Sequence, residues 1–350
     1  VEGLFLCTLM AGVLLVVLGA TGMGSALRFI PRPVVVGFTN GIAILIASTQ
    51  IRDFFGLNVD TVPGDFLPRM KLLASQFRTW SPEATALAVA TLVIILNSKR
   101  LSRRVPGTII ALVTGTIAAR ALGLDVETIG TRFGGIPSGL PTLHFPQFRP
   151  ALIPGLIVPA MTVAMLGAIE SLMSAMVADR MSGDRHDSNV ELVAQGIANI
   201  ASPLFGGLPA TGAIARTATN IRNGARTPVA GIVHALTLLV ILFSAAPLAR
   251  HIPLSVLAAI LCVVAYNMGD WKEIPELLRL TKTDVTVWIV TFALTVFADL
   301  TQAVGVGMVC AALLFIKRVA DTTTVSAVSA DYVREGHAHI LQNKIIPAYV

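Results

Sequence analysis

The fold is decided by the stretch Phe205-Gly206-Gly207-Leu208-Pro209-Ala210-Thr211-Gly212-Ala213-Ile214-Ala215-Arg216-Thr217. It lies among long apolar runs, yet it is too short and too rich in glycine and proline to cross a bilayer as one helix. A half-length, glycine-interrupted segment at membrane depth is typical of the binding site of a secondary transporter. Backbone released from helical pairing is tolerated there only where it lines a cavity or is buried in protein. The N-terminus of a half-helix offers free N–H groups and a positive dipole end, which suit an anion.

The composition excludes a soluble protein. Hydrophobic residues make up 54% of the 350 residues, charged residues make up 13%, and the mean hydropathy is +0.76, whereas a soluble domain has about 25% charged residues. The net charge of +6 does not indicate a nucleic-acid partner, because the basic residues cluster between apolar runs as in membrane proteins. The three cysteines lie inside apolar runs and have neither disulfide nor metal-site spacing. The sequence therefore predicts an all-α polytopic membrane protein.

Apolar runs of spanning length alternate with short polar loops. A weaker run at 190–205 and the short segment 209–220 complete the pattern. If the basic loop 99–104 is cytoplasmic, alternation places most of the other basic residues on the same side. We therefore expect a multi-pass protein of the cell (inner) membrane with a cytoplasmic C-terminus. The spanning runs are 3–20, 34–51, 84–98, 106–122, 151–178, 228–247, 253–267, 284–299 and 301–317.

A weak internal repeat relates the two halves of the chain. The tripeptide Phe29-Ile30-Pro31 precedes the run 34–51, and His251-Ile252-Pro253 opens the run 253–267. Inverted repeats are common in secondary transporters. If this repeat is real, the central segments have no partners, and three helices are expected before Val1.

Four stretches, 28–39, 166–172, 178–196 and 206–217, resemble the sulfate permease (SulP) family, also called solute carrier family 26. They are similar to that family's entry to helix five, its helix eight, the loop that follows and its half-length helix ten. The resemblance covers nearly the whole chain. It implies a UraA-like fold of fourteen helices in a seven-plus-seven inverted repeat, with a core that grips the substrate and a gate. It also implies a fragment that lacks the first three helices and most of the cytoplasmic STAS domain.

The resemblance divides the chain into four parts. Residues 1–150 would hold helices four to seven on the gate side, and 151–225 would hold core helices eight to ten with the half-helix site. Residues 226–320 would hold gate-side helices eleven to fourteen. Residues 321–350 would form a cytoplasmic linker and the start of the STAS domain. A homodimer is the expected assembly.

The candidate substrate site consists of the backbone N–H groups of Gly212, Ala213, Ile214 and Ala215 with the side chain of Arg216. An intramembrane arginine is costly unless paired or hydrated, so it is a functional candidate, and the equivalent arginine of the family lies near the anion. Glycine permits close backbone approach. The alternative is that Arg216 only reaches the cytoplasmic interface and that the glycines serve helix packing.

The candidate coupling-ion site consists of Glu170 and Ser174. Glu170 lies deep inside the run 151–178, where a carboxylate should be protonated or paired, and Ser174 lies one turn further on the same helical face. In sodium-coupled bicarbonate members of the family, an aspartate and a threonine bind sodium at these positions. Glutamate and serine here put a sodium site in doubt, and Glu170 could carry a coupling proton instead. The alternative is a structural partner for a neighbouring helix.

The polar loop 184–191 could suggest a metal cluster, but Ser188 and Glu191 are spaced as a capping box that opens the next helix. We therefore expect no metal and no cofactor. Gln195 and Asn199 are four residues apart, and we expect them to hydrogen-bond across the bundle.

Together these features predict secondary active transport of an inorganic or carboxylate anion of the sulfate, C4-dicarboxylate or bicarbonate class. The expected partners are this small anion, a coupling proton or sodium ion, and the lipid bilayer; an elevator-like slide of the core past the gate follows from the resemblance. The alternatives are an uncoupled anion channel or an exchanger of the same family. We expect no enzyme, because the sequence shows neither Ser/His pairing nor a metal-binding helix motif.

Overall fold

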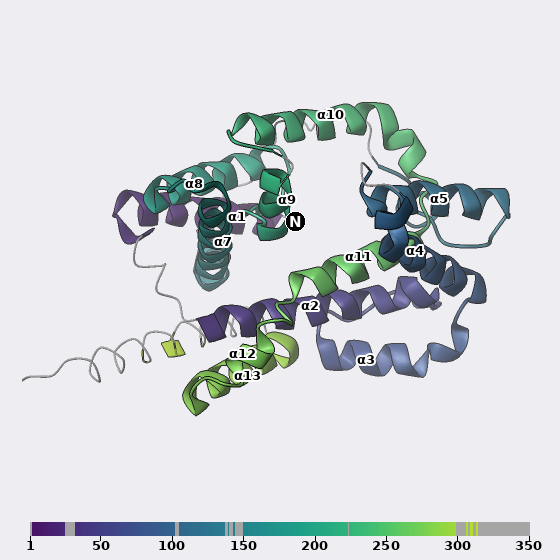
Figure 1. The fold of residues 1–350 in the computed structure, drawn as a ribbon, viewed down its shortest axis with the longest axis horizontal. Coiled ribbons are helices and arrows are strands. Elements are labelled where there is room, and N and C mark those ends of the chain that lie inside the picture. Colours follow the sequence, from purple (N-terminus) through teal and green to yellow (C-terminus); the bar gives the residue numbers. More distant parts are fainter. Residues whose placement is uncertain are drawn as a thin grey trace, which may run out of the picture. The chain divides into compact units, whose positions relative to one another are not determined.

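The computed structural model describes residues 2–24, 32–101, 105–136, 150–222 and 224–298, with isolated positions at 139, 143, 306, 309, 310 and 313. Within these residues the fold is helical (Figure 1), and the one pairing of extended backbone is an isolated bridge between Thr128 and Pro253. The longer helices are α1 (Glu2–Ala20), α2 (Arg32–Phe55), α4 (Pro82–Leu101), α5 (Gly107–Ala121), α7 (Ile153–Ser182), α8 (Ser188–Leu204), α9 (Ile214–Arg222), α10 (Val229–Ala249), α11 (Leu254–Met268) and α13 (Lys282–Phe297). The shorter ones are α3 (Phe66–Ser75), α6 (Ile129–Phe133), α12 (Ile274–Leu277) and the 3-10 turns Phe77–Thr79 and Pro150–Leu152.

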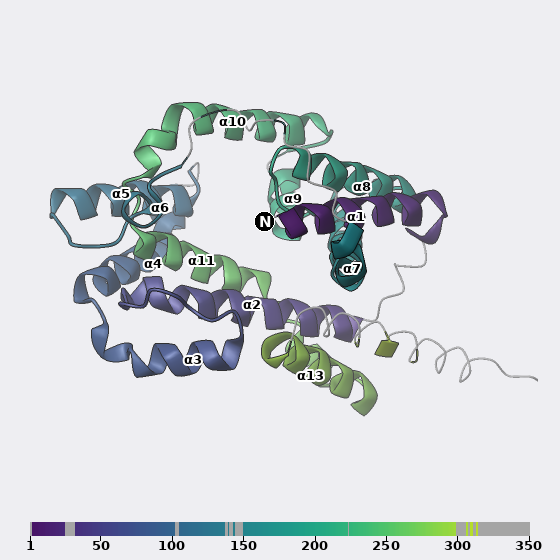
Figure 2. The same ribbon diagram turned by 180° about the vertical axis from the view of Figure 1, so that it is seen from behind.

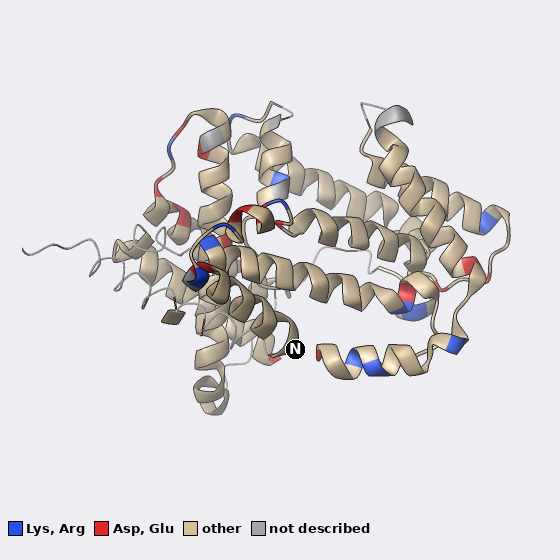
Figure 3. Ribbon diagram, turned by 60° about the horizontal axis from the view of Figure 1, so that its bottom comes forward, with Lys and Arg blue, Asp and Glu red and all other residues tan. Residues whose placement is uncertain are grey.

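These helices confirm the predicted spans wherever the structure describes them. Four segments, Glu2–Ala20, Arg32–Phe55, Pro150–Asp179 and Val229–Ala249, are long and apolar enough to cross a membrane, and four shorter helices are also apolar. Charged residues lie mostly at helix ends and in the connections between helices (Figure 3). The predicted span 301–317 lies almost entirely outside the described residues, and the predicted linker and start of the STAS domain, 321–350, lie wholly outside them.

Helix α3 was not predicted, because it is too short to span and its apolar residues form no long run. Arg69, on its buried side, is 6% exposed. The guanidinium donates to Ser48 Oγ at 2.8 Å and to the carbonyl of Pro63 at 3.1 Å. A buried polar side chain with backbone and hydroxyl partners therefore anchors this helix, and hydropathy does not reveal such an anchor.

The contacts between helices form two groups. In one, α1 packs against α8 and α7, and α7 packs against α8 and α9. In the other, α2 packs against α3, α4, α11 and α13, and α5 packs against α4 and α11. Helix α1, which the resemblance places in 1–150, makes its most extensive contacts with α7 and α8, and its Leu18 also packs against the cluster of Phe38 and Met165.

The seam between α1 and α8 is formed by backbone on both sides, and the two helices run side by side (Figure 2). A β-carbon added at Gly12 would lie 2.8 Å from the carbonyl oxygen of Gly196, and one added at Gly196 would lie 2.7 Å from the carbonyl oxygen of Gly12. One added at Gly19 would lie 2.6 Å from the carbonyl oxygen of Asn189. Small residues allow such close approach of membrane helices, so glycine packing fixes α8 on α1.

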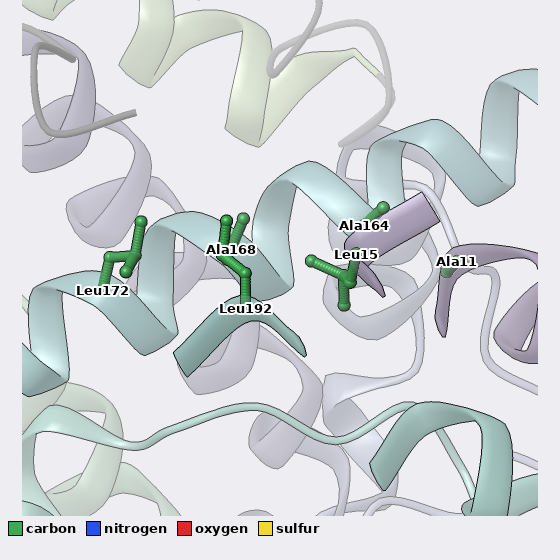
Figure 4. Close-up of a cluster of buried hydrophobic side chains, with 6 residues drawn as sticks. All are labelled: Ala11, Leu15, Ala164, Ala168, Leu172 and Leu192. Carbon is green, nitrogen blue, oxygen red and sulfur yellow. The ribbon is translucent and has the colours of Figure 1, made fainter. Parts of the chain in front are cut away.

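An apolar cluster joins these helices to α7 (Figure 4). It consists of Ala11 and Leu15 of α1, Leu192 of α8, and Ala164, Ala168 and Leu172 of α7. All six side chains are at most 2% exposed. This cluster packs α7 and α8 against each other and against α1.

Candidate functional site

Helix α8 ends in a tight glycine turn. Gly206 has φ +68°, a left-handed conformation that glycine adopts without strain. The N–H groups of Gly206 and Gly207 donate to the carbonyls of Pro203 and Ser202 at 3.1 and 2.8 Å. Residues 207–213 are then irregular, and α9 begins only at Ile214. The predicted interruption is confirmed, but the helix starts later than the expected residue 209.

Helix α9 is half-length. Its nine residues, Ile214–Arg222, correspond to about 14 Å at about 1.5 Å per residue, against a hydrocarbon core of about 30 Å. The helix cannot cross a bilayer.

Side chains of α8 and a backbone carbonyl of α7 hold the irregular segment in place. Asn199 Nδ2 donates to the Ala210 carbonyl at 2.8 Å, and the Ala210 N–H donates to Asn199 Oδ1 at 2.9 Å. Gln195 Nε2 also donates to the Ala210 carbonyl. Ser202 Oγ donates to the Leu208 carbonyl at 2.7 Å, and Thr211 Oγ1 donates to the Gly167 carbonyl at 3.0 Å. Gln195 and Asn199 were expected to hydrogen-bond across the bundle, but their partners lie in the irregular segment that follows their own helix, and for Asn199 also in that helix itself.

Gly212 lies against α7 at close range. A β-carbon there would be 3.2 Å from Ser171 Cα and 3.3 Å from Ser174 Cβ. One turn into α9, Thr217 Oγ1 shares a hydrogen bond of 2.7 Å with Ser174 Oγ. The start of α9 is thus attached to α7 by a glycine contact and a pair of hydroxyls.

The start of α9 leaves backbone donors unpaired. The N–H of Thr217 donates to the Ala213 carbonyl at 2.9 Å. Among the described residues, the N–H groups of Gly212, Ala213 and Ile214 donate no hydrogen bond, as expected of groups at a helix N-terminus. Ala215 lies in the same turn. The Arg216 side chain is exposed and has no hydrogen bond or ion pair to the described residues. This arrangement can accept a negative group.

Glu170 lies within α7, half-buried. Its carboxylate has neither a hydrogen bond nor an ion pair within the part of the chain that the structure describes. Ser174 is 5% exposed, and its hydroxyl is engaged by Thr217 of α9. The two predicted coupling residues therefore share a helix, but the structure shows no bond between them.

The predicted capping box at Ser188 and Glu191 is wrong. Asp187 is the N-cap of α8, because its carboxylate accepts from the N–H groups of Asn189 at 2.8 Å and Val190 at 3.3 Å. A carboxylate at this position also meets the positive end of the helix dipole. Glu191 is then free to accept a hydrogen bond from Ser171 Oγ at 2.5 Å, which ties α8 to α7.

A serine, a histidine and an aspartate meet at the turn between α7 and α8, where the sequence indicated no Ser/His pairing. The His186 Nδ1–Asp179 Oδ2 distance is 2.7 Å, and the Ser188 Oγ–His186 Nε2 distance is 3.0 Å. The order of contacts is that of a hydrolase triad. However, Ser188 is 3% exposed, so its hydroxyl cannot meet a substrate. This cluster stabilises the turn, and only the folded turn brings its members together.

The sequence profile of the Sulfate permease family matches residues 1–291. The Bacillus subtilis protein named "Putative sulfate transporter YvdB" is 46% identical over 325 residues, which are 93% of this chain and 61% of that protein. The Synechocystis bicarbonate transporter BicA is 34% identical over 316 residues, which are 90% of this chain and 55% of that protein. The chain therefore spans 61% or less of the length of these two relatives.

Solved structures confirm the fold class. The transmembrane domain of a cyanobacterial bicarbonate transporter BicA matches with a TM-score of 0.77 and 34% identity, covering 87% of this chain and 77% of that domain. The murine Slc26a9 anion transporter in its inward-facing state matches with a TM-score of 0.78 and 20% identity, covering 90% and 52%. The second match concerns the fold alone. The chain has the all-α, polytopic architecture of a membrane transporter.

Proposed function

Because the chain belongs to the sulfate permease family, we propose that it supplies the anion-binding half-helix of a secondary active transporter. The substrate is an inorganic or carboxylate anion of the sulfate, bicarbonate or C4-dicarboxylate class. The observation that carries the proposal is the break before Ile214, where backbone N–H groups have no partner among the described residues and Arg216 follows within one turn. The names of the relatives, which are sulfate and bicarbonate transporters, support this substrate class.

The binding chemistry follows from these donors. An oxyanion entering a low-dielectric site loses its hydration, and several N–H groups aimed at one point replace the lost hydrogen bonds. Gly212 brings the backbone close without a side chain in the way, and Arg216 supplies a full positive charge.

Coupling is assigned to Glu170. It lies on α7 one residue before Ser171, against which Gly212 packs, and its carboxylate lacks a partner among the described residues. A proton taken up by Glu170 would offset the charge of the incoming anion. Sodium remains the alternative coupling ion.

The transport step is assigned to movement of α1, α7, α8 and α9 as one body past the group that contains α2. The backbone seam at Gly12 and Gly196 and the cluster around Leu192 support movement without rearrangement inside that body. We propose further that the full-length protein is a homodimer of the inner membrane with its C-terminus in the cytoplasm.

The first prediction concerns Arg216→Ala in the full-length protein. The KM for sulfate uptake into proteoliposomes should rise about tenfold or more, because a hydrogen bond to a charged group contributes about 1.5–3 kcal/mol. Arg120→Ala, which removes an exposed arginine from the end of α5, is the matched control and should leave uptake unchanged. An unaltered KM for both sulfate and bicarbonate in Arg216→Ala would remove this residue from the site.

The second prediction concerns Glu170→Gln, which imitates the protonated carboxyl. Wild-type uptake should fall as the external pH rises, because a proton must bind with the anion. The glutamine variant should lose this dependence, and an imposed proton gradient should no longer drive its uptake. Replacing sodium by choline in parallel tests the other coupling ion. Uptake of Glu170→Gln that keeps the full pH dependence would show that Glu170 is not the proton site.

The channel and exchanger alternatives separate in the same vesicles. A coupled carrier gives saturable, concentrative uptake driven by a cation gradient. A channel gives conductance without concentrative uptake, and an exchanger requires an anion inside the vesicle. Either of the latter results would replace symport by that alternative.

A further inference from the structure

The side chain of Asn199 pairs with the backbone of Ala210 at both of its polar groups. Nδ2 donates to the Ala210 carbonyl at 2.8 Å, and Oδ1 accepts from the Ala210 N–H at 2.9 Å. The second Nδ2 proton goes to the Gln195 carbonyl at 2.9 Å. The opposite amide orientation would place oxygen against two carbonyl oxygens, so this pattern fixes the orientation. Asn199 is 2% exposed, and both of its Nδ2 protons and its Oδ1 atom are engaged in hydrogen bonds.

The carbonyl of Ala210 is saturated by these contacts. It accepts one hydrogen bond from Asn199 and another from Gln195, and a carbonyl oxygen has two lone pairs. In a continuous helix the same carbonyl would accept from the N–H four residues later, which is that of Ile214. That N–H has no partner among the described residues, and α9 begins at this residue.

We propose that Asn199 and Gln195 act as a helix stop that prevents α9 from extending toward its N-terminus. By occupying the Ala210 carbonyl, they keep the Ile214 N–H available to an anion. Both are positioning residues. The inference rests on the proposed function in one respect only, namely that the ligand of the free Ile214 N–H is an anion. Without the stop, the freed carbonyl would take the Ile214 N–H, because unpaired backbone groups are strongly disfavoured at membrane depth. The half-helix would gain a turn, and the anion site would lose the Ile214 N–H as a donor.

The test measures hydrogen–deuterium exchange over residues 208–217 in the purified full-length protein, without anion and with sulfate or bicarbonate. In the wild-type protein the start of α9 should exchange quickly without anion and slow down when an anion is added. In Asn199→Leu, which keeps the side-chain size, exchange at Ile214 should already be slowed on the order of tenfold without anion, because a helical hydrogen bond now protects it. Sulfate should slow it little further.

Uptake provides the second readout. The KM for sulfate should rise about tenfold in Asn199→Leu, because one hydrogen bond to the anion is lost, while the maximal rate per folded transporter changes much less. A purely structural role would lower the amount of folded protein and leave the KM of the remainder unchanged.

Ser202→Ala is the matched control. It removes the 2.7 Å hydrogen bond from α8 to the Leu208 carbonyl of the same segment but leaves the pairing at Ala210 intact. Its exchange and KM should equal those of the wild type. If it reproduces the effects of Asn199→Leu, general loosening of the segment explains them and the helix stop is wrong.

Gln195→Leu decides the matter if Asn199→Leu does not fold. Gln195 is only half-buried, and its loss frees one lone pair of the Ala210 carbonyl, so the same changes should occur with smaller amplitude. A folded Gln195→Leu or Asn199→Leu protein with wild-type exchange would overturn the proposal. The exchange measured without anion requires no substrate, so it tests the helix stop even if neither sulfate nor bicarbonate binds. In that case the proposed function fails and the helix stop is still tested.

Discussion

Gly12→Val is expected to abolish the folded full-length protein. The new β-carbon would lie 2.8 Å from both the Gly196 carbonyl oxygen and the Ile200 backbone nitrogen. Backbone atoms cannot rotate away as a side chain can, so α1 and α8 must separate. Overpacking in a core costs about 1–3 kcal/mol even where side chains can adjust, and the total stability of a protein is only about 5–15 kcal/mol. We expect loss of the monodisperse peak in size-exclusion chromatography after detergent extraction.

Gly3→Val is the matched control for this experiment. It places the same side chain on the same helix, where a β-carbon meets nothing within 4 Å. Its elution profile and thermal stability should equal those of the wild type. If the Gly12 and Gly3 variants behave alike, the close seam between α1 and α8 does not exist in the protein.

Gly212→Val is expected to reduce sulfate uptake to the background level while the protein remains folded. Its β-carbon would lie 3.2 Å from Ser171 Cα, a backbone atom that cannot yield, and its methyl groups would need further space. The segment must therefore lift from α7, which displaces the unpaired N–H groups at the start of α9. Donors that must converge on one anion do not tolerate such a displacement.

The matched control is Gly155→Val, on α7 itself, where a β-carbon meets nothing within 4 Å. This variant should transport like the wild type. Size-exclusion profiles of both variants show whether the uptake values refer to folded protein. Wild-type KM and maximal rate in a folded Gly212→Val protein would contradict the placement of the anion at this contact.

The membrane spans could be predicted from the sequence because their length and apolar character are imposed by the bilayer. The interruption after α8 could be predicted for a similar reason, since Gly206 and Pro209 disfavour a continuous helix. The start of α9 at Ile214 could not be predicted, because it is set by side chains of α8 that reach Ala210. Local sequence at 209–213 contains no sign of that contact.

The details of the loop between α7 and α8 were also beyond the sequence. Asp187 and Ser188 are both good N-cap residues, and the pattern at Glu191 favoured the serine. In the structure Glu191 is instead engaged by Ser171 of α7, and the aspartate caps. The grouping of α1 with α7 and α8 likewise depends on packing between distant segments, whereas order along the chain placed it with residues 1–150.

The donors at 212–214 that lack a partner among the described residues belong to the main chain, which limits how an anion site of the proposed kind can diversify. No substitution deletes a peptide N–H, save one to proline, so in the proposed site these donors are lost only when the backbone is displaced, as expected for Gly212→Val, or paired, as expected for Asn199→Leu. Discrimination between a tetrahedral sulfate, a planar bicarbonate and a longer dicarboxylate must then come from side chains that shape the surrounding walls. In a site of the proposed kind, substitution of the surrounding side chains can therefore change the substrate preference while the backbone N–H groups continue to attract anions.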